Sequence, residues 1–367
     1  MVTFDWSSND AKKKFMNFDD RRRLSWIVLE VTDRCNFKCK WCYSNSWRNK
    51  NPKDLSYRRV SRVLGYLADE GVGQVTLSGG EPTMYPYLRQ TIKEARDLGL
   101  VVHMNTNGFL FDEKMAEDLY SLGLSQIQVN IDSLDPDKHD RIRGMRGSWH
   151  RAVGALMNAR DVGMTAACQT VLTSENEDEI LDIFKFARSM GIPRCRTWDM
   201  TSSNGFSAED LKLLPRDYMS SLQMLADYAH SSGAKNIEAG EPLFKQHIKT
   251  PLNISGGFCV AEAGLYATIS NTGGVYFCAT IRKPLYNIFD IMSAGLNLNP
   301  NHTRYITSFL ENKKIAHDCM RCPYLDNCKG GCLTRLEQMK NRLDYWCKIA
   351  PSASRIREYI NPHPLRT

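Results

Sequence analysis

The sequence lacks the segments that would place the protein in a membrane or on a nucleic acid. No apolar run is long enough to span a bilayer, which needs about 20 mostly apolar residues. Residues 1–23 are polar and charged and contain no apolar core of a signal peptide. There is no dense basic tract with interleaved aromatic residues, which argues against nucleic-acid binding. We therefore expect a cytosolic protein with no membrane or nucleic-acid partner.

The net charge is modest, whereas the cysteine content is high. The formal net charge of +7 is interpreted as an ordinary solvated surface. An anionic substrate, a leader peptide or an electron donor is the alternative explanation. The 367 residues include 12 cysteines, and 42% of the residues are hydrophobic, enough for a sizeable core. Because cytosolic thiols are kept reduced, this many cysteines indicates metal binding rather than disulfides.

Hydrophobic periodicity predicts alternating strands and helices from residue 24 to about residue 232. The expected strands are 24–31, 73–78, 101–105, 127–131, 165–172 and 194–199. The expected helices are 56–67 (with Ser56 as its cap), 88–98, 115–122, 153–159, 180–190 and 211–228. Six strand–helix units in succession indicate an α/β fold with a parallel sheet and helices outside it. Ligands of such sheets bind at the carboxyl ends of the strands.

Three cysteines lie close together after the first expected strand. Cys35, Cys39 and Cys42 have the spacing Cys-x3-Cys-x2-Cys, and Tyr43 follows the last of them. The alternative is a zinc site or a disulfide pair, but zinc usually takes four ligands and no fourth Cys or His lies nearby. Three thiolates can instead hold an iron–sulfur cube with one iron left open. An open iron can bind a small molecule and deliver an electron to it.

This run resembles the cluster motif of the radical S-adenosylmethionine (SAM) superfamily, and Gly79, Gly80 and Glu81 match that family's second motif. Paired glycines let the backbone approach a ligand closely, and a carboxylate suits a ligand ammonium group. The resemblance implies a partial (β/α)6 barrel and a [4Fe-4S] cluster whose open iron chelates SAM. It also implies that an electron from the cluster splits SAM into a 5′-deoxyadenosyl radical, which abstracts hydrogen from a substrate.

The same resemblance implies further SAM contacts at the strand ends. The segment 79–81 would hold the methionine end of SAM. Ser133, after the fourth expected strand, best matches the family position that contacts the ribose, and Asn107 and Asn130 are weaker candidates. The alternative for each of these three residues is a structural role, either as the cap of a turn or as a hydrogen-bonded amide at a strand end.

The carboxyl-terminal part contains seven of the twelve cysteines. Cys259 and Cys278 flank a hairpin signal at residues 270–274, and a run of four cysteines and a lone cysteine follow. Taken alone, the run of four would fit a zinc site. With a radical SAM core upstream, the whole set resembles the SPASM extension, which carries two auxiliary [4Fe-4S] clusters. By this resemblance the distal cluster is bound by Cys319, Cys322, Cys328 and Cys347, and the nearer one by Cys259, Cys278 and Cys332.

The SPASM resemblance sets the expected domain organisation and leaves one ligand open. We expect a polar extension at 1–23, a radical SAM core at 24–235 and a small cysteine-rich α+β SPASM domain at 236–367. No eighth cysteine lies near Cys259. The nearer cluster therefore has an open iron, a non-cysteine ligand, or Cys195 as its fourth ligand. Such clusters can accept or relay electrons, which suits oxidation of a substrate radical.

Two further cysteines lie in expected core strands. If Cys168 or Cys195 faces the barrel interior, its thiol can donate a hydrogen atom to a substrate radical, as in radical SAM epimerases. The simpler explanation is that free cysteine is often a buried small hydrophobe. His103, before the third strand end, is interpreted as structural.

We expect a radical SAM/SPASM enzyme that abstracts hydrogen from an unactivated carbon of a peptide or protein, with a flavodoxin- or ferredoxin-type electron donor. One alternative is a dehydrogenase or epimerase of a sugar, an aminocyclitol or another small hydroxylated metabolite. Another is a non-catalytic electron carrier, against which the motif at 79–81 argues. Ala279 and Thr280 follow Cys278 where sulfatase-maturing members have an Asp, so sulfatase maturation is not expected. Only about two dozen residues precede the first strand, so a winged-helix leader-binding domain is not expected.

Overall fold

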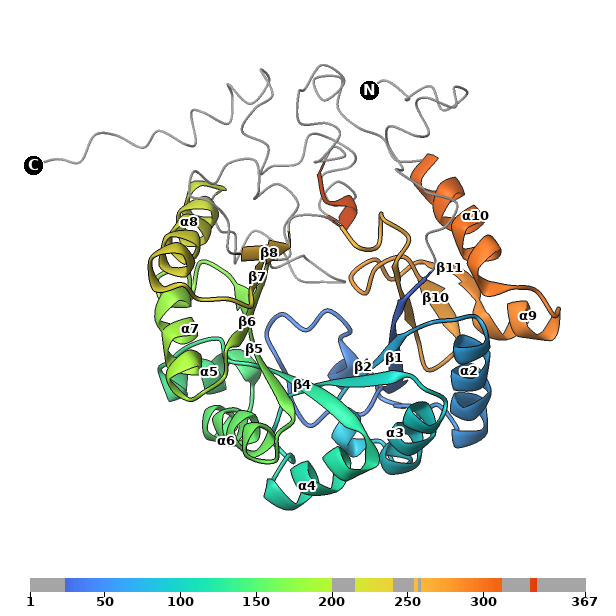
Figure 1. Cartoon of the computed structure of the whole chain (residues 1–367), viewed down its shortest axis with the longest axis horizontal. Helices are drawn as coiled ribbons and strands as arrows, with labels where there is room; N and C mark the ends of the chain where they lie inside the picture. The colour runs from blue at the N-terminus through green and yellow to red at the C-terminus, as the bar shows by residue number, and fades with distance from the viewer. Residues whose placement is uncertain (1–23, 200–214, 240–253, 257–258, 312–330, 335–367) are drawn as a thin grey trace, which may run out of the picture.

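The computed structural model describes residues 24–199, 215–239, 254–256, 259–311 and 331–334. In these ranges an open sheet of 11 strands curves around the centre of the molecule (Figure 1). The strands are β1 (Trp26–Thr32), β2 (Gln74–Gly79), β3 (Val101–Thr106), β4 (Leu124–Asn130), β5 (Thr165–Leu172), β6 (Arg194–Asp199), β7 (Ile237–Ala239), β8 (Ile254–Gly256), β9 (Tyr266–Ile269), β10 (Gly274–Tyr276) and β11 (Pro284–Asn287). Their spatial order is β11-β10-β9-β1-β2-β3-β4-β5-β6-β7-β8. Pairing is parallel except at β10, which is antiparallel to β9 and β11.

The helices α2 to α8 lie outside this curved sheet, and α9 and α10 lie beside the β10–β11 edge (Figure 1). The α-helices are α2 (Tyr57–Asp69), α3 (Leu88–Asp97), α4 (Glu113–Leu122), α5 (Pro136–Arg143), α6 (Ser148–Asp161), α7 (Ile180–Ser189), α8 (Pro215–Ser232), α9 (Ile288–Ser293) and α10 (Leu298–Glu311). Two 3-10 helices, η1 (Ser46–Arg48) and η2 (Pro82–Met84), follow the cysteine loop and β2.

The six expected strand–helix units are confirmed. The strands expected at 165–172 and 194–199 coincide with β5 and β6, and the other four are displaced or extended by a few residues. Residues 211–214 of the last expected helix lie outside the described ranges, and α8 extends beyond the expected end at 228. Ser56 precedes α2, but its side chain makes no capping bond; its carbonyl accepts from the N–H groups of Arg59 and Val60.

The helix α5 is not among the sequence expectations, although its ends carry ordinary signals. The carboxylate of Asp135 accepts the N–H groups of Asp137 and Lys138, Pro136 occupies the first turn, and Gly144 ends the helix at φ +63°. Only His139 and Ile142 of this short helix are buried. An apolar stripe is therefore too sparse for periodicity to reveal the helix.

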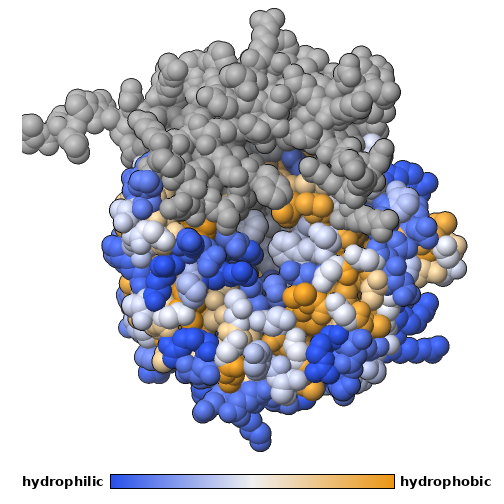
Figure 2. Space-filling view, viewed as in Figure 1, coloured by the Kyte–Doolittle hydropathy of each residue, from blue (hydrophilic) through white to orange (hydrophobic). Residues whose placement is uncertain are grey.

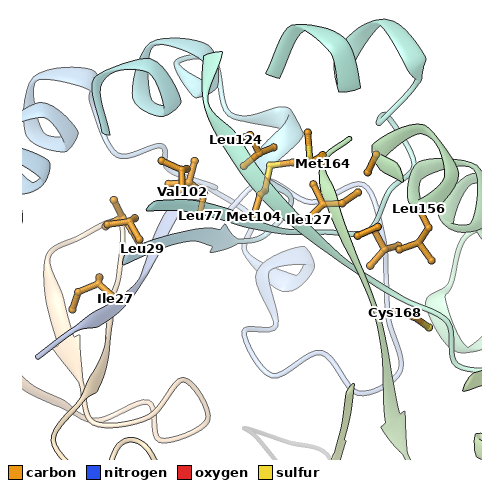
Figure 3. Close-up of a cluster of buried hydrophobic side chains, with 14 of the residues drawn as sticks. Ile27, Leu29, Leu77, Val102, Met104, Leu124, Ile127, Leu156, Met164 and Cys168 are labelled. Carbon is orange, nitrogen blue, oxygen red and sulfur yellow. The ribbon is translucent and has the colours of Figure 1, made fainter. Parts of the chain in front are cut away.

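The main hydrophobic core fills the space between the sheet and its helices. Figure 3 shows how Ile27, Leu29, Leu77, Val102 and Ile127 contribute to one continuous cluster. Successive side chains of a strand point to opposite faces, so alternate residues of the same strands lie on the inner face. Many of these are polar: His103, Gln126, Gln128, Gln169, Arg194, Arg196 and Glu238. The inner face is thus a polar surface within an apolar shell.

Strands from the carboxyl-terminal part extend both edges of the sheet. β9 pairs in parallel with β1, with Trp26 opposite Tyr266, while β7 and β8 continue from β6. The described residues after 236 therefore share one sheet with the core. The domain boundary expected at 235/236 stays a prediction.

The helices of the described chain include none with the length and apolar composition needed to cross a bilayer. On the face shown in Figure 2, hydrophilic residues cover most of the helical rim.

Candidate active site

The first three cysteines lie together in the loop that follows β1. All three are partly exposed and make no disulfide. The pKa of Cys35 is raised to about 12, mainly by burial, with smaller contributions from the charges of Glu81, Cys39 and Cys42. A metal bound by these thiols would have to supply the positive charge that stabilises their thiolate form.

The donor set of this loop fits an iron–sulfur cluster. Across the described ranges, no three Cys, His, Asp or Glu side chains converge at the distances of one metal ion. In a cube-shaped cluster each thiolate instead binds a separate iron corner. Cys35, Cys39 and Cys42 supply three such thiolates from one loop.

The two glycines of the second motif pack directly against this cysteine loop. Gly79 has φ +118°, and a Cβ on it would lie 2.4 Å from the carbonyl oxygen of Thr32. A Cβ on Gly80 would lie 2.1 Å from the carbonyl oxygen of Arg34. The N–H of Gly80 donates to Thr32 O and that of Glu81 to Arg34 O, both at 2.7 Å. The glycines therefore join the two motifs, a role additional to the expected approach of a ligand.

Glu81 joins the ends of β2 and β3. Its side chain is buried, and its Oε1 accepts the Thr83 hydroxyl at 2.7 Å and the Thr106 hydroxyl at 2.6 Å. Its Oε2 accepts the N–H of Asn107 at 2.7 Å. Burial raises the pKa of Glu81, and these hydrogen bonds oppose that effect. The expected contact of this carboxylate with a ligand ammonium group stays a prediction.

Asn107 links the end of β3 to the cysteine loop. Its Nδ2 donates to Asn36 Oδ1 at 2.8 Å, and its Oδ1 accepts the N–H of Phe109 at 2.9 Å. Asn130 is partly exposed at the end of β4, where Gln169 Nε2 donates to it at 3.5 Å. Both asparagines are at the expected edge of the sheet, and their contact with SAM remains a prediction.

Ser133 has surroundings that match the turn-cap explanation. It is fully buried, and its hydroxyl donates to Glu179 Oε2 at 2.7 Å. The same hydroxyl accepts the N–H of Asp135 at 3.1 Å, and the Ser133 carbonyl accepts Trp149 Nε1 at 3.1 Å. These contacts fix the turn before α5, and they argue against a free hydroxyl for the ribose.

The carboxyl end of α5 docks on the cysteine loop, a contact that the sequence reasoning missed. The N–H of Lys40 donates to Ile142 O at 2.9 Å. A Cβ on Gly144 would lie 2.5 Å from the carbonyl oxygen of Lys38, so only glycine allows this approach. Arg143 Nη1 lies 3.8 Å from Cys39 Sγ. The signals at the two ends of α5 would have predicted the helix but not its partner.

His139 of α5 is a buried neutral imidazole. Its Nδ1 accepts the N–H of Asp132 at 3.2 Å, so this nitrogen carries no proton. Burial lowers the pKa of His139 to about 3, and the positive charge of Arg143 adds to the effect. The unfolded chain therefore binds a proton below about pH 6.5 that the folded protein does not take up.

We expect the stability of the fold to fall in acid through His139. Between pH 7 and pH 5 this residue should reduce the free energy of unfolding by about 2 kcal/mol. H139N keeps a hydrogen-bond acceptor but cannot titrate, so denaturant unfolding at both pH values should show a smaller loss for the variant. Equal losses in the two proteins would contradict the assignment.

Cys168 and Cys195 lie on the helix-facing side of the sheet. Both are fully buried members of the hydrophobic core, they stand opposite each other in the β5–β6 register, and Cys168 is visible among apolar neighbours in Figure 3. Cys195 Sγ lies 3.9 Å from the carbonyl oxygens of Phe184 and Ile192. These positions argue against a hydrogen donor facing the interior, and against Cys195 as a ligand of an auxiliary cluster.

His103 lies on the inner face of β3, near Arg194 and Arg196. Burial lowers its pKa to about 4, and the positive charges of Arg194 and Arg196 lower it further. It is therefore neutral at pH 7, as expected for a structural histidine.

Three of the carboxyl-terminal cysteines gather beside the inner face of β1. Cys278 Sγ lies 3.2 Å from Thr280 Oγ1, which lies 2.8 Å from the hydroxyl oxygen of Thr334, two residues after Cys332. Burial raises the pKa of Cys259, and the charges of Glu262, Cys278 and Cys332 add to the increase. Cys259 and Cys278 pack on an apolar cluster that includes Val28 of β1. The predicted ligands of the distal cluster, Cys319, Cys322, Cys328 and Cys347, lie outside the described residues.

A buried ion pair joins this region to β1. Arg282 Nη1 and Nη2 lie 2.7 and 2.9 Å from the two carboxylate oxygens of Glu30. The hydroxyl of Tyr43, directly after Cys42, lies 3.4 Å from Ser78 Oγ. Burial raises the pKa of Tyr43, and the charge of Glu30 adds to the effect. Polar groups therefore occupy the space between the two sets of cysteines.

Comparison with known proteins identifies the core. Residues 29–187 match the family model described as the radical SAM superfamily. These residues form a radical SAM domain. The match covers less than half of the chain, and the superfamily implies SAM and one [4Fe-4S] cluster for this domain.

The relatives differ in how much of the chain they match. Fe-coproporphyrin III synthase of Methanosarcina barkeri is 32% identical over 168 residues, which are 46% of this chain and 42% of that protein. PqqA peptide cyclase of Gluconobacter oxydans is 25% identical over 344 residues, which are 91% of this chain and 93% of that protein. The structure of Streptococcus suis SuiB bound to the precursor peptide SuiA has a TM-score of 0.72 at 20% identity and covers 92% of this chain and 79% of that one. The chain thus spans less than half of the first relative and most of the second.

Proposed function

We propose that this radical SAM protein is a SPASM-type enzyme that modifies a peptide or protein. The observation that carries the proposal is the packing of Cys259 and Cys278 on the apolar cluster at the inner face of β1, with Thr280 bonded to Thr334, two residues after Cys332. The same strand leads into the loop of the first three cysteines. An auxiliary cluster held there would lie at the same polar interior as the SAM site.

Each group of side chains has a distinct task in this proposal. The bound cluster and SAM supply a 5′-deoxyadenosyl radical that abstracts hydrogen from an unactivated carbon. Cys35, Cys39 and Cys42 would hold this cluster through their three thiolates. Glu81 fixes the strand ends around them through its buried hydrogen bonds. The predicted auxiliary ligands would hold two further clusters, which would supply sites for an electron removed from the substrate.

The inner face of the sheet suits a substrate with amide groups. Arg196 Nη1 donates to Gln128 Oε1 at 3.2 Å, and its Nε donates to Glu238 Oε2 at 2.7 Å. Such side chains can exchange partners with the N–H and C=O groups of a peptide. PqqA peptide cyclase is named for a peptide substrate, and SuiB is seen bound to a precursor peptide. Both match most of the chain, which supports a peptide as the substrate of this protein.

Two other substrate classes give different outcomes in one assay. The protein is reconstituted anaerobically, reduced with dithionite and given SAM with pooled peptides, pooled sugars and aminocyclitols, or pooled tetrapyrroles. We expect 5′-deoxyadenosine in all mixtures and a stimulation of several-fold, with deuterium exchange, only by the peptide pool. Stimulation by the sugars would favour a dehydrogenase or epimerase of a small hydroxylated metabolite, and stimulation by the tetrapyrroles would favour the activity of the first relative.

The same assay tests the non-catalytic alternative. A fully iron-loaded protein that forms no 5′-deoxyadenosine would favour an electron carrier. A flavodoxin or ferredoxin should replace dithionite as the reductant, because the proposed reaction needs one low-potential electron at the first cluster.

A further inference from the structure

Arg143 is the charged side chain that meets a cysteine of the first motif. Its Nη1 lies 3.8 Å from Cys39 Sγ, within hydrogen-bond range for sulfur. Burial raises the pKa of Cys39, and the charge of Arg143 is the largest opposing influence. The guanidinium thus favours negative charge on this sulfur.

A buried carboxylate holds the guanidinium in place. Arg143 Nη2 forms an ion pair with Asp132 Oδ2 at 2.5 Å, and the Asp132 side chain is fully buried. Asp132 is itself fixed, because its Oδ1 accepts the N–H of Val171 at 3.1 Å and its own N–H donates to His139. Nη2 and Oδ2 are close enough for an ion pair but are not aligned as a hydrogen bond. The attraction between the two buried charges keeps the guanidinium beside Cys39.

The guanidinium that contacts Cys39 has an unused N–H group, and the backbone at the end of α5 is held in place. Within the described ranges, Nε of Arg143 is buried and has no hydrogen-bond partner. The end of α5 is tied to the loop by the Lys40–Ile142 hydrogen bond and by the close approach at Gly144. Helix α5 therefore places a positive charge beside Cys39, one of the ligands of the predicted cluster.

We propose that Arg143, positioned by Asp132, donates to the Cys39 sulfur and raises the reduction potential of the SAM-binding cluster. The inference rests on the proposed function, in which Cys39 binds that cluster. One electron from a flavodoxin- or ferredoxin-type donor adds one negative charge to the cluster, and a nearby positive charge stabilises the reduced form. Hydrogen bonds to the ligand sulfurs are a recognised determinant of cluster potential. Asp132 positions Arg143, and its own negative charge lowers the reduction potential.

The test is an EPR-monitored redox titration of the reconstituted protein. The signal that is absent from a C35A/C39A/C42A variant is assigned to the SAM-binding cluster. At a fixed solution potential, R143Q should lower the ratio of reduced to oxidised cluster about tenfold, equivalent to about 59 mV for one electron. R143K should retain part of the effect, and D132N should shift the ratio the other way, because Arg143 is then no longer neutralised.

Arg141 provides a matched control on the same helix. It is exposed, and R141Q removes the same charge without touching Cys39, so its potential should equal that of the wild type. An iron-loaded R143Q with an unchanged potential, or equal shifts in R143Q and R141Q, would overturn the inference. If R143Q does not retain iron, R143K and D132N decide: an unchanged potential in both variants would overturn the inference. Retention of the assigned signal in C35A/C39A/C42A would instead refute the proposed function itself.

Discussion

Replacing Cys35, Cys39 and Cys42 together by alanine should reduce 5′-deoxyadenosine formation to the background of the assay. Three thiols from one loop are the protein's whole contribution to the predicted SAM-binding cluster, so no ligand remains to hold its irons. Iron analysis should show a loss of about four atoms per chain, the content of one [4Fe-4S] cluster. The measurement combines anaerobic reconstitution, iron and sulfide determination, and chromatography of the dithionite-reduced reaction.

The matched control is C259A/C278A/C332A, which alters the other group of adjacent thiols. This variant should lose iron of its own yet still form 5′-deoxyadenosine, because the first loop is untouched. Product formation on a peptide substrate should stop. Persistent cleavage of SAM by C35A/C39A/C42A would contradict the assignment of the SAM site, and unchanged iron in the control would contradict the auxiliary site.

Gly80→Ala should unfold or displace the junction between the two motifs. The added Cβ would lie 2.1 Å from the carbonyl oxygen of Arg34, and both atoms belong to backbones joined by short hydrogen bonds. Overpacking of this kind costs about 1–3 kcal/mol and occasionally more. We expect a loss near 3 kcal/mol in the free energy of unfolding, measured by denaturant titration. Reconstitution should also give less iron at the first motif, because the cysteine loop must move away.

Gly154→Ala is the control for this substitution. Gly154 lies inside α6, and no atom is within 4 Å of the position of an added Cβ. Alanine is favoured over glycine inside a helix by about 0.5–1 kcal/mol, so this variant should be at least as stable as the wild type. Equal stability of the two variants would show that the backbone at Gly80 relaxes freely.

The cysteine loop illustrates what sequence reasoning reaches and where it stops. The spacing of Cys35, Cys39 and Cys42 is local, so the sequence alone indicates a shared ligand set. The two glycines of the second motif are also visible in the sequence, but their clash with the carbonyls of Thr32 and Arg34 is not. That contact joins segments separated by more than 40 residues, and only the parallel pairing of β1 with β2 creates it.

The buried cysteines of β5 and β6 show a second limit. Alternation in a strand predicts that every other residue shares a face. The inner face carries the polar Gln169, Arg194 and Arg196 and the other face is apolar, but the sequence does not show which of the two faces lines the interior. Cys168 and Cys195 belong to the helix-facing set, together with Ile127 and Val129 of the neighbouring strand.

The sequence by itself determined the six strand–helix units, the edge at which the motifs lie and the three-cysteine loop, because each depends on periodicity or spacing over a few residues. The tertiary structure decided which distant groups meet. Arg143 approaches Cys39 across 104 positions of sequence, and β9 pairs with β1 and brings Cys259 and Cys278 to the interior. Such contacts follow from the curvature of the sheet and the close packing of its loops, and no local pattern records them.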